Sequence, residues 1–207
     1  MDPELDLQNP GPGQDAYGPA GAGTGGGWLD DFADAYLEVV EDRFREFIEE
    51  NDLASTVRVQ RDRDGVRLRM ETVILFGSGN ATVSPKGAEV LDEISEITTG
   101  LDVGAVVSGH ADNVPIRNGV FASNWELSAA RAAGVARSLV NQGHPPTMVR
   151  VESFGELKPV ASNDTPEGRS MNRRVELSYG RSDVTTAALM LLEQETSETA
   201  AGEASTG

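Results

Sequence analysis

The chain has 207 residues, no cysteine and a formal net charge of −17. Its length suits one domain with flanking segments. Most of the negative charge lies in those flanks: residues 1–52 hold 14 acidic and 2 basic residues, residues 181–207 hold 5 and 1, and residues 53–180 hold 15 and 14. Because nucleic-acid binding needs a basic face, this distribution argues against nucleic acid as a partner. The lack of cysteine fits a reducing compartment or an exported protein without disulfides.

The first segment, residues 1–27, is rich in glycine and proline and is predicted to be a flexible linker. The sequence has no run of about 18 apolar residues and no signal peptide, so no membrane span is predicted. Because Met1 leads directly into the glycine- and proline-rich segment, we expect this chain to be a fragment of a longer protein.

Residues 28–52 are predicted to form an acidic amphipathic helix. Large apolar side chains recur every three or four residues between Trp28 and Phe47, and the other face is strongly acidic. Periodicity alone leaves two interpretations open: the helix docks on its own domain, or it packs against another subunit or a neighbouring segment.

Residues 53–180 are predicted to form the α/β domain, which begins with a hairpin. Alternating apolar residues flank the turn at Asp64 and Gly65. The hairpin also carries a stripe of basic residues that either faces solvent or meets the acidic helix. This stripe comprises Arg58, Arg61, Arg63, Arg67 and Arg69.

The rest of the domain alternates between strand and helix patterns, which indicates two layers. Four strands are predicted, at residues 73–76, 103–107, 148–154 and 175–179. Helices are predicted at residues 85–100 and 124–143, and the turn-rich segment 155–169 is predicted to be a loop. Residues 181–207 are predicted to hold a short helix, 184–192, and a disordered acidic tail.

The central stretch, residues 109–134, combines an acid, an amide and an arginine beside a helix start. Asp112 follows an apolar strand, and Ser123 and Glu126 fit a capping box. Arg131 is expected at the edge of the buried stripe of the helix that follows, where it needs an anionic partner. Asp112 is one such partner; alternatively, the two residues bind opposite ends of a zwitterion, the acid an ammonium and the guanidinium a carboxylate.

Five segments in this order resemble the OmpA-like peptidoglycan-binding domain: ILFGSGNATVSPKG, SGHADNVPI, SNWELSAARA, SFGELKPVASNDTPEGR and MNRRVELSY. The resemblance covers roughly residues 70–180. Within that superfamily, DNVPI followed by SNWELSAARA looks most like the B subunits of flagellar motor stators. The resemblance implies an α/β two-layer sandwich of βαβαβ–β type that binds peptidoglycan without catalysis, cofactor or metal.

The resemblance also implies a site for the diaminopimelate residue of the peptide stem. Asp112 and Arg131 match the acid and arginine that hold its amine and carboxylate, and Asn124 and Leu127 are assigned to the same site. Arg173 and Arg174 match the arginines of the family's NRR segment, either of which could reach a further carboxylate. Since adjacent strand residues point to opposite faces, only one of these two can face the site.

Two positions depart from the family. Ala111 stands where threonine is usual, and Phe154 where tyrosine is usual, so one or two hydroxyl contacts are expected to be absent.

The stator resemblance also implies partners and a location. It implies a periplasmic or extracytoplasmic homodimer whose parent protein is anchored in the cell membrane by one N-terminal span absent from this sequence. Through that span the parent would contact the stator A subunit, and flagellar basal-body ring proteins are further candidate partners.

Enzyme and metal alternatives have less support. Ser108, His110 and Asp112 are close in sequence but lack a nucleophile elbow, so His110 is expected to be structural. His144 has no companion at zinc-ligand spacing, and the loop acids form no calcium-binding series.

Two other functions remain open: a general envelope tether with no flagellar role, and a dimerisation module in which residues 28–51 are the main interaction surface.

Overall fold

The computed structural model describes residues 27–98, 104–116, 119–181 and 183–184. Eleven elements occur in the described chain. In order, they are α1 (Gly27–Glu50), β1 (Val57–Asp62), β2 (Gly65–Glu71), α2 (Thr72–Leu75), α3 (Pro85–Thr98), β3 (Ala105–Gly109), α4 (Asn124–Asn141), the 3-10 helix η1 (Pro146–Met148), β4 (Val149–Ser153), α5 (Pro166–Asn172) and β5 (Arg174–Gly180). The predicted linker, apart from Gly27, which is the first residue of α1, lies outside the described residues, as does the helix expected at 184–192 apart from its first residue.

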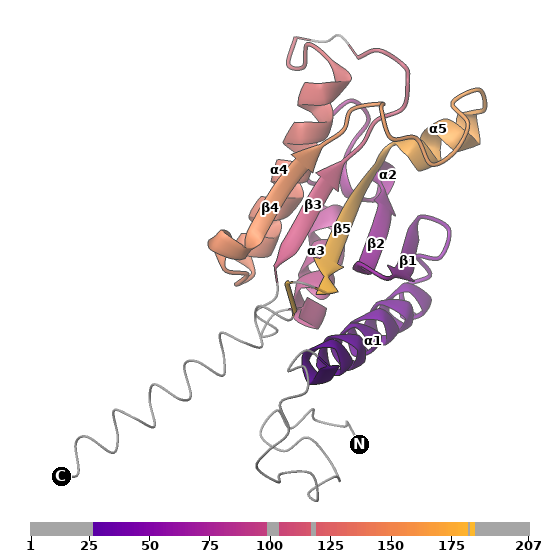
Figure 1. Ribbon diagram of the computed structural model, residues 1–207. Helices are drawn as coiled ribbons and strands as arrows, with labels where there is room; N and C mark the ends of the chain where they lie inside the picture. The colour runs from indigo at the N-terminus through magenta and orange to yellow at the C-terminus, as the bar shows by residue number, and fades with distance from the viewer. Residues whose placement is uncertain (1–26, 99–103, 117–118, 182, 185–207) are drawn as a thin grey trace, which may run out of the picture.

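The five strands form one sheet in the order β1-β2-β5-β3-β4. β3 and β4 are parallel and are joined by the crossover helix α4, whereas the other neighbouring strands are antiparallel. The helices α3 and α4 lie behind the sheet in Figure 1, and α1 contacts β1, β2 and α3. This arrangement confirms the predicted two-layer α/β class, with the hydrophobic core between the sheet and these helices.

The helix α1 packs on its own domain. Every third or fourth side chain along it is fully or almost fully buried in the common core, where Phe44 lies 6.0 Å from the ring of Tyr179. The structure therefore shows the first of the two arrangements that the periodicity left open. The opposite, acidic face remains exposed.

The basic stripe of the hairpin divides between the two faces of the sheet. Arg61 contacts α1, where it donates to the Asp34 carboxylate at 3.0 Å. Arg67 and Arg69 lie on the face without helices, and both pair with Glu176 of β5. Both interpretations of the stripe are therefore partly correct.

Two sequence-based assignments were wrong. The predicted strand 73–76 is mostly the short helix α2, because β2 already pairs with β5 as far as Glu71 and the chain must turn there; only Phe76 forms an isolated bridge, to Val83. The predicted loop 155–169 continues into a helix, α5, which begins after Thr165. The Thr165 hydroxyl accepts from the Gly168 N–H, and Pro166 occupies the first turn.

The described helices include none long and apolar enough to cross a membrane.

Candidate functional site

The chain after β3 is fixed close to α4. A Cβ on Gly109 would lie 2.1 Å from the Ser128 carbonyl oxygen, so only glycine allows the strand to approach the helix this closely. The next two residues are held by backbone hydrogen bonds, from the His110 N–H to the Arg174 carbonyl and from the Ala111 N–H to the Gly155 carbonyl. Asp112 is thereby placed at a defined position at the end of the sheet.

Asp112 is 7% exposed and its carboxylate has two partners in the protein. One oxygen accepts from the Val114 N–H at 3.1 Å, and the other accepts from Arg173 Nη1 at 2.7 Å. Arg173 therefore holds the carboxylate at the pocket. The internal salt bridge considered for Asp112 does form, but with Arg173 rather than Arg131.

The start of α4 fixes Asn124 beside Asp112. Ser123 caps the helix as predicted: its hydroxyl accepts from the Trp125 N–H and contacts the Glu126 carboxylate. The Asn124 side-chain nitrogen lies 3.1 Å from the Asp112 carbonyl oxygen and 2.7 Å from the Glu156 carboxylate. This amide joins the loop after β3 to the loop after β4.

Arg131 is a buried cation, 4% exposed. Its Nε donates to the Asn80 carbonyl at 2.8 Å, and its guanidinium carbon lies 5.4 Å from the centre of the Phe76 ring. Among the described residues it has no ion-pair partner within 4.0 Å. Burial, reinforced by the positive charge of Arg173, lowers the pKa of Arg131 to about 10, so the group stays charged at neutral pH and needs an anion.

These side chains meet at a cavity of about 400 Å³. Both charged and apolar side chains line it. The lining residues are Ser78, Gly79, Ala111, Asp112, Val114, Pro115, Ile116, Asn124, Leu127, Arg131, Arg169 and Arg173.

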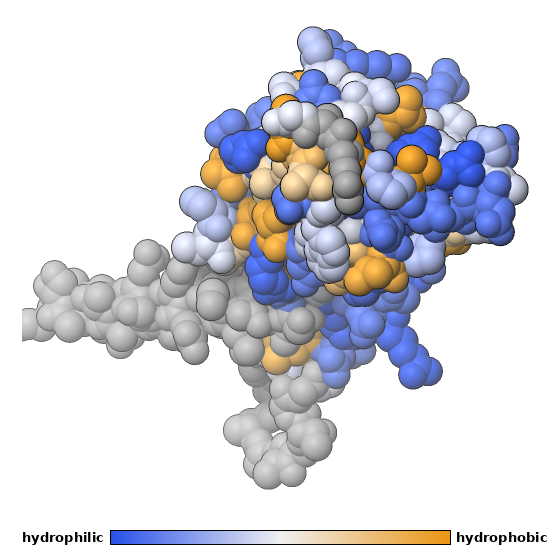
Figure 2. Space-filling view, turned by 90° about the horizontal axis from the view of Figure 1, so that it is seen from above, coloured by the Kyte–Doolittle hydropathy of each residue, from blue (hydrophilic) through white to orange (hydrophobic). Residues whose placement is uncertain are grey.

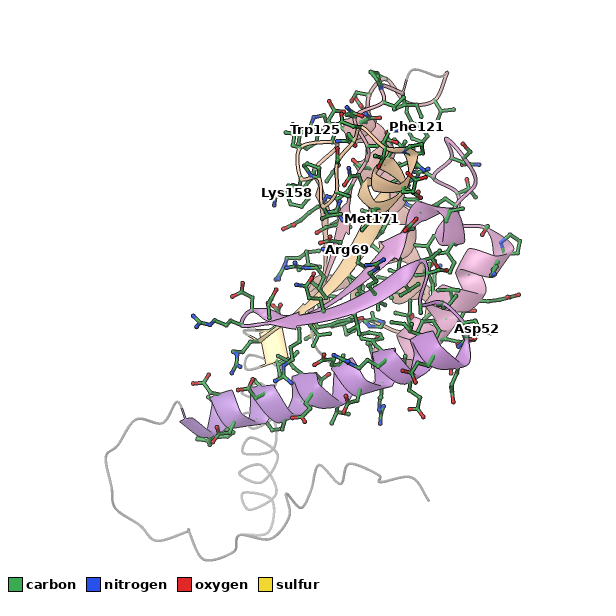
Figure 3. All side chains as sticks on the ribbon, turned by 90° about the vertical axis from the view of Figure 1, so that its right-hand side faces the viewer. Asp52, Arg69, Phe121, Trp125, Lys158 and Met171 are labelled. Carbon is green, nitrogen blue, oxygen red and sulfur yellow. The ribbon has the colours of Figure 1, made fainter. Side chains whose placement is uncertain are left out.

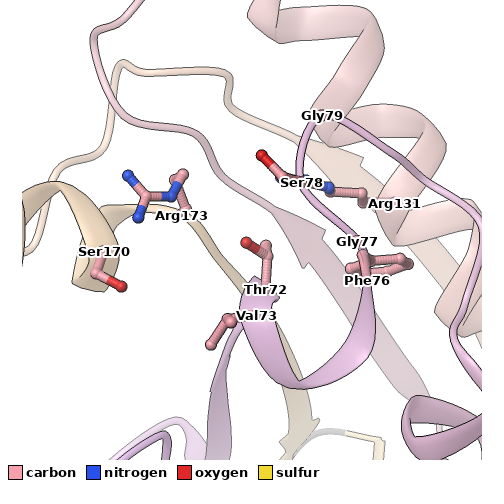
Figure 4. Close-up of a pocket in the computed structure, with 9 residues that line it drawn as sticks. All are labelled: Thr72, Val73, Phe76, Gly77, Ser78, Gly79, Arg131, Ser170 and Arg173. Atoms are coloured by element: carbon pink, nitrogen blue, oxygen red, sulfur yellow. The ribbon is translucent and has the colours of Figure 1, made fainter.

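A smaller cavity of about 170 Å³ adjoins the first one, with which it shares Ser78, Gly79, Arg131 and Arg173. Figure 4 shows Arg131 and Arg173 on opposite sides of this smaller cavity, with Thr72 between them. Arg131 and Arg173 thus border both cavities.

The structure brings five of the six predicted site residues together and places the sixth elsewhere. Asp112, Asn124, Leu127, Arg131 and Arg173 all line the larger cavity. Arg174 is 2% exposed and belongs to a separate cluster, in which its Nε donates to Glu176 at 2.6 Å. The alternation of strand side chains had predicted that only one of the two arginines would reach the site.

Sequence reasoning missed Arg169 and the segment Ser78–Gly79. Arg169 precedes Arg173 by four residues, so the two would have been placed on one helix face if α5 had been predicted from its Thr165-Pro166 start. For Ser78 and Gly79 the only signal was the Gly-Ser-Gly turn itself.

The two family departures lie at or near the site. Ala111 lines the cavity with a methyl group, and Phe154 stacks on His110 with ring centres 5.2 Å apart. His110 is 2% exposed, consistent with the expected structural role.

No cluster of metal-binding side chains occurs within the described part of the chain. The Nε2 of His144 lies 3.0 Å from the hydroxyl of Thr98.

A five-stranded sheet with helices on one face and a charged pocket at its end defines a small ligand-binding α/β domain. Residues 75–173 match the model of the OmpA family. The chain belongs to the OmpA family, and the matched domain is of a structural, non-catalytic kind.

The chain is similar to motility and cell-wall proteins. It is 36% identical to Motility protein B of Bacillus subtilis over 143 residues, 68% of this chain and 55% of that protein. Its fold is similar to that of a putative MotB-like protein from Desulfovibrio vulgaris, with a TM-score of 0.68 and 26% identity over 74% of this chain and 96% of the other. It also matches the cell wall anchor of the T6SS from Pseudomonas aeruginosa, with a TM-score of 0.61 and 32% identity over 65% and 94% of the two chains.

Proposed function

We propose that this chain binds the peptide stem of peptidoglycan through the cavity between Asp112 and Arg131. The observation that carries the proposal is the buried guanidinium of Arg131, which faces the cavity without a carboxylate partner among the described residues. A carboxylate of the ligand would complete it in a bidentate pair. The Asp112 carboxylate, held by Arg173, would accept an ammonium group of the same ligand.

Diaminopimelate in the stem peptide has both groups at its free end, an ammonium and a carboxylate on one carbon. The cavity of about 400 Å³ is large enough for this end and part of the attached peptide. Its apolar lining, which includes Leu127 and Ile116, suits the methylene chain between the two ends of the diamino acid.

We further propose that the parent protein is the B subunit of a flagellar motor stator. Similarity to Motility protein B and to a MotB-like structure supports this assignment. The domain would then anchor an ion-driven stator to the cell wall from the extracytoplasmic side. The membrane span, the A-subunit contact and the homodimer belong to the same proposal.

The second candidate is a general envelope tether without a flagellar role, which the similarity to a T6SS cell wall anchor favours. The sequence upstream of this segment in its gene distinguishes the two. A single membrane span carrying an aspartate would identify a stator subunit, and a lipoprotein signal or a β-barrel would identify a tether.

Wall binding is tested by sedimentation with purified diaminopimelate-type peptidoglycan. We expect Arg131→Ala and Asp112→Ala each to weaken binding by roughly 2–5 kcal/mol, since each removes one partner of a buried, hydrogen-bonded charge pair. Arg131→Met keeps a long unbranched side chain but removes the guanidinium, and it should lose binding to a similar extent. Arg137→Ala is the matched control, because Arg137 is an exposed arginine of the same helix that does not line the cavity. Equal sedimentation of the wild type and the Arg131 and Asp112 variants would refute the site.

A further inference from the structure

An indole ring lies exposed beside the pocket. Trp125, in the first turn of α4, is 49% exposed. A Cβ placed on Gly155 would meet three atoms of the indole ring at 3.5 Å each, so the ring lies flat on the backbone of Gly155. One face of the indole is therefore covered by the protein, and the exposed area belongs to the rest of the ring.

Hydrogen bonds fix the backbone on both sides of this ring, at Gly155 and at Trp125. The Gly155 N–H donates to the Ser128 hydroxyl at 3.2 Å, and the Ser153 hydroxyl donates to the Trp125 carbonyl at 3.1 Å. Gly155 also has a φ of +50°, a conformation that favours glycine. The loop after β4 and the first turn of α4 thus form one rigid support, which limits the entropy cost of binding on it.

The loop that supports the indole carries both apolar and polar side chains. Leu157, two residues after Gly155, is 67% exposed, and the ammonium of Lys158 lies 3.5 Å from the centre of the Phe154 ring. Trp125 and Lys158 lie on the same side of the molecule in Figure 3. Viewed from above, the surface alternates between hydrophobic and hydrophilic groups and has no single large apolar face (Figure 2). Such a mixture is unlike the apolar centre of a permanent protein interface.

The indole also adjoins the proposed peptide pocket. Asn124, the residue before Trp125, lines that pocket, and its side-chain nitrogen donates to Glu156, the residue after Gly155. The pocket wall and the support of the indole are therefore built from the same two segments. A polymer with a side branch in the pocket would have its main chain close to this surface.

We propose that Trp125, Gly155 and Leu157, together called the Trp125 platform, bind the sugar rings of the glycan strand whose peptide occupies the pocket. This inference rests on the proposed function and adds a second class of ligand to it. A pyranose ring presents polarised C–H groups on one face, which pack against the negative face of an indole. Leu157 would contact an acetamido methyl group, and Lys158 and Glu156 would bond to hydroxyl and amide groups. Binding at both sites would raise the affinity for intact wall above that for either part.

The test separates the two parts of the polymer. Peptide-free glycan chains and free diaminopimelate-containing stem peptide are titrated separately into the full chain. We expect the wild type to bind both, and Trp125→Ala to bind the glycan roughly five- to tenfold more weakly while binding the peptide normally. Arg131→Ala should show the reverse. Trp28→Ala is the matched control, because Trp28 is 51% exposed on the distant helix α1, and it should bind both ligands normally.

Fluorescence gives a second measurement that does not depend on an alanine variant. The chain has 2 tryptophans, so Trp28→Phe leaves Trp125 as the sole indole. Glycan should shift its emission to shorter wavelength, and the shift should saturate. An unchanged emission spectrum, no glycan binding by the wild type, or equal glycan binding by wild type and Trp125→Ala would each overturn the platform. Failure of the peptide pocket would instead show as loss of peptide binding by the wild type.

Discussion

Arg131 and Asp112 border one cavity, but their charged groups have different contacts. Asp112 forms an ion pair with Arg173, whereas the described residues in contact with Arg131 are a carbonyl and an aromatic ring and include no carboxylate. Removing a cation from water costs several kcal/mol, and a cation–π contact returns about 1–2 kcal/mol. The apo site is therefore strained electrostatically at Arg131, and a ligand carboxylate would relieve that strain.

His110 provides a test of the buried environment beneath the site. Burial lowers the pKa of His110 to about 4, and the positive charges of Arg174, Lys158 and Arg69 add to this effect. The negative charge of Glu176 opposes it in part. Because the folded-state pKa lies below the unfolded value of about 6.5, the fold favours neutral histidine. This contribution to stability is fully present above about pH 6.5 and is lost as the pH falls toward 4.

His110→Phe keeps a ring against Phe154 but cannot take up a proton. We therefore expect its unfolding free energy to decrease less than that of the wild type when the pH falls from about 7 to about 5. Denaturant titration at the two pH values measures the difference. His144 also has a lowered pKa through burial, so the variant should keep part of the pH dependence. The same pH dependence in both proteins would show that His110 is not held neutral by the fold.

At the level of single elements, α1 is part of the domain and not an appendage. Phe44 is fully buried between this helix and the sheet, whereas Phe32, three turns earlier on the helix, is 36% exposed. We expect Phe44→Ala to lower the unfolding free energy of the whole domain by roughly 3–5 kcal/mol. Phe32→Ala should cost less than about 1 kcal/mol.

Equilibrium unfolding followed by circular dichroism measures both variants. If α1 served only as a dimerisation helix, Phe44→Ala would leave domain stability unchanged and would alter the sedimentation coefficient instead. The packing of α1 also means that deletion of residues 28–51 would expose the core, so a lost dimer in that deletion could not be attributed to a lost interface.

Elements with a long, regular period were predictable from the sequence. α1, α3 and α4 each show several turns of apolar spacing, α3 and α4 also have a marked start, and the hairpin shows alternation around Asp64-Gly65. The short elements were not predictable, because the run of four apolar residues at 73–76 fits a strand as well as a helix turn. α5 has few apolar residues, and its only signal was its capped start.

The candidate site was predictable only where its residues lie at the ends of elements with a regular pattern. Asp112, Asn124 and Arg131 follow directly from a strand end and a helix start that the sequence marks clearly. The choice between Arg173 and Arg174 depended on where β5 begins, and the partner of Asp112 depended on a contact across 61 residues of sequence. Neither is encoded in local periodicity.

In the whole molecule, the flanking segments are strongly acidic and the central segment is not. The central segment, residues 53–180, is close to neutral. Three of its arginines, Arg67, Arg69 and Arg174, share the carboxylate of Glu176 on the open sheet face. Burial alone would raise the pKa of Glu176, but the hydrogen bond from Arg174 and the charges of Arg174 and Arg69 outweigh it and lower that pKa. The open face thus holds an ion cluster, whereas the buried Arg131 at the pocket has no ion-pair partner among the described residues.

The proposed pocket recognises an ammonium and a carboxylate together. Calorimetric titration of the wild type with three stem peptides measures the contribution of each group: one peptide has the native free end of diaminopimelate, one has that carboxylate amidated, and one has that amine acetylated. We expect each modification to weaken binding at least about tenfold, and amidation to cause no further loss in Arg131→Ala because the lost partner is the same. Equal affinity of the wild type for the native and the amidated peptide would contradict the account.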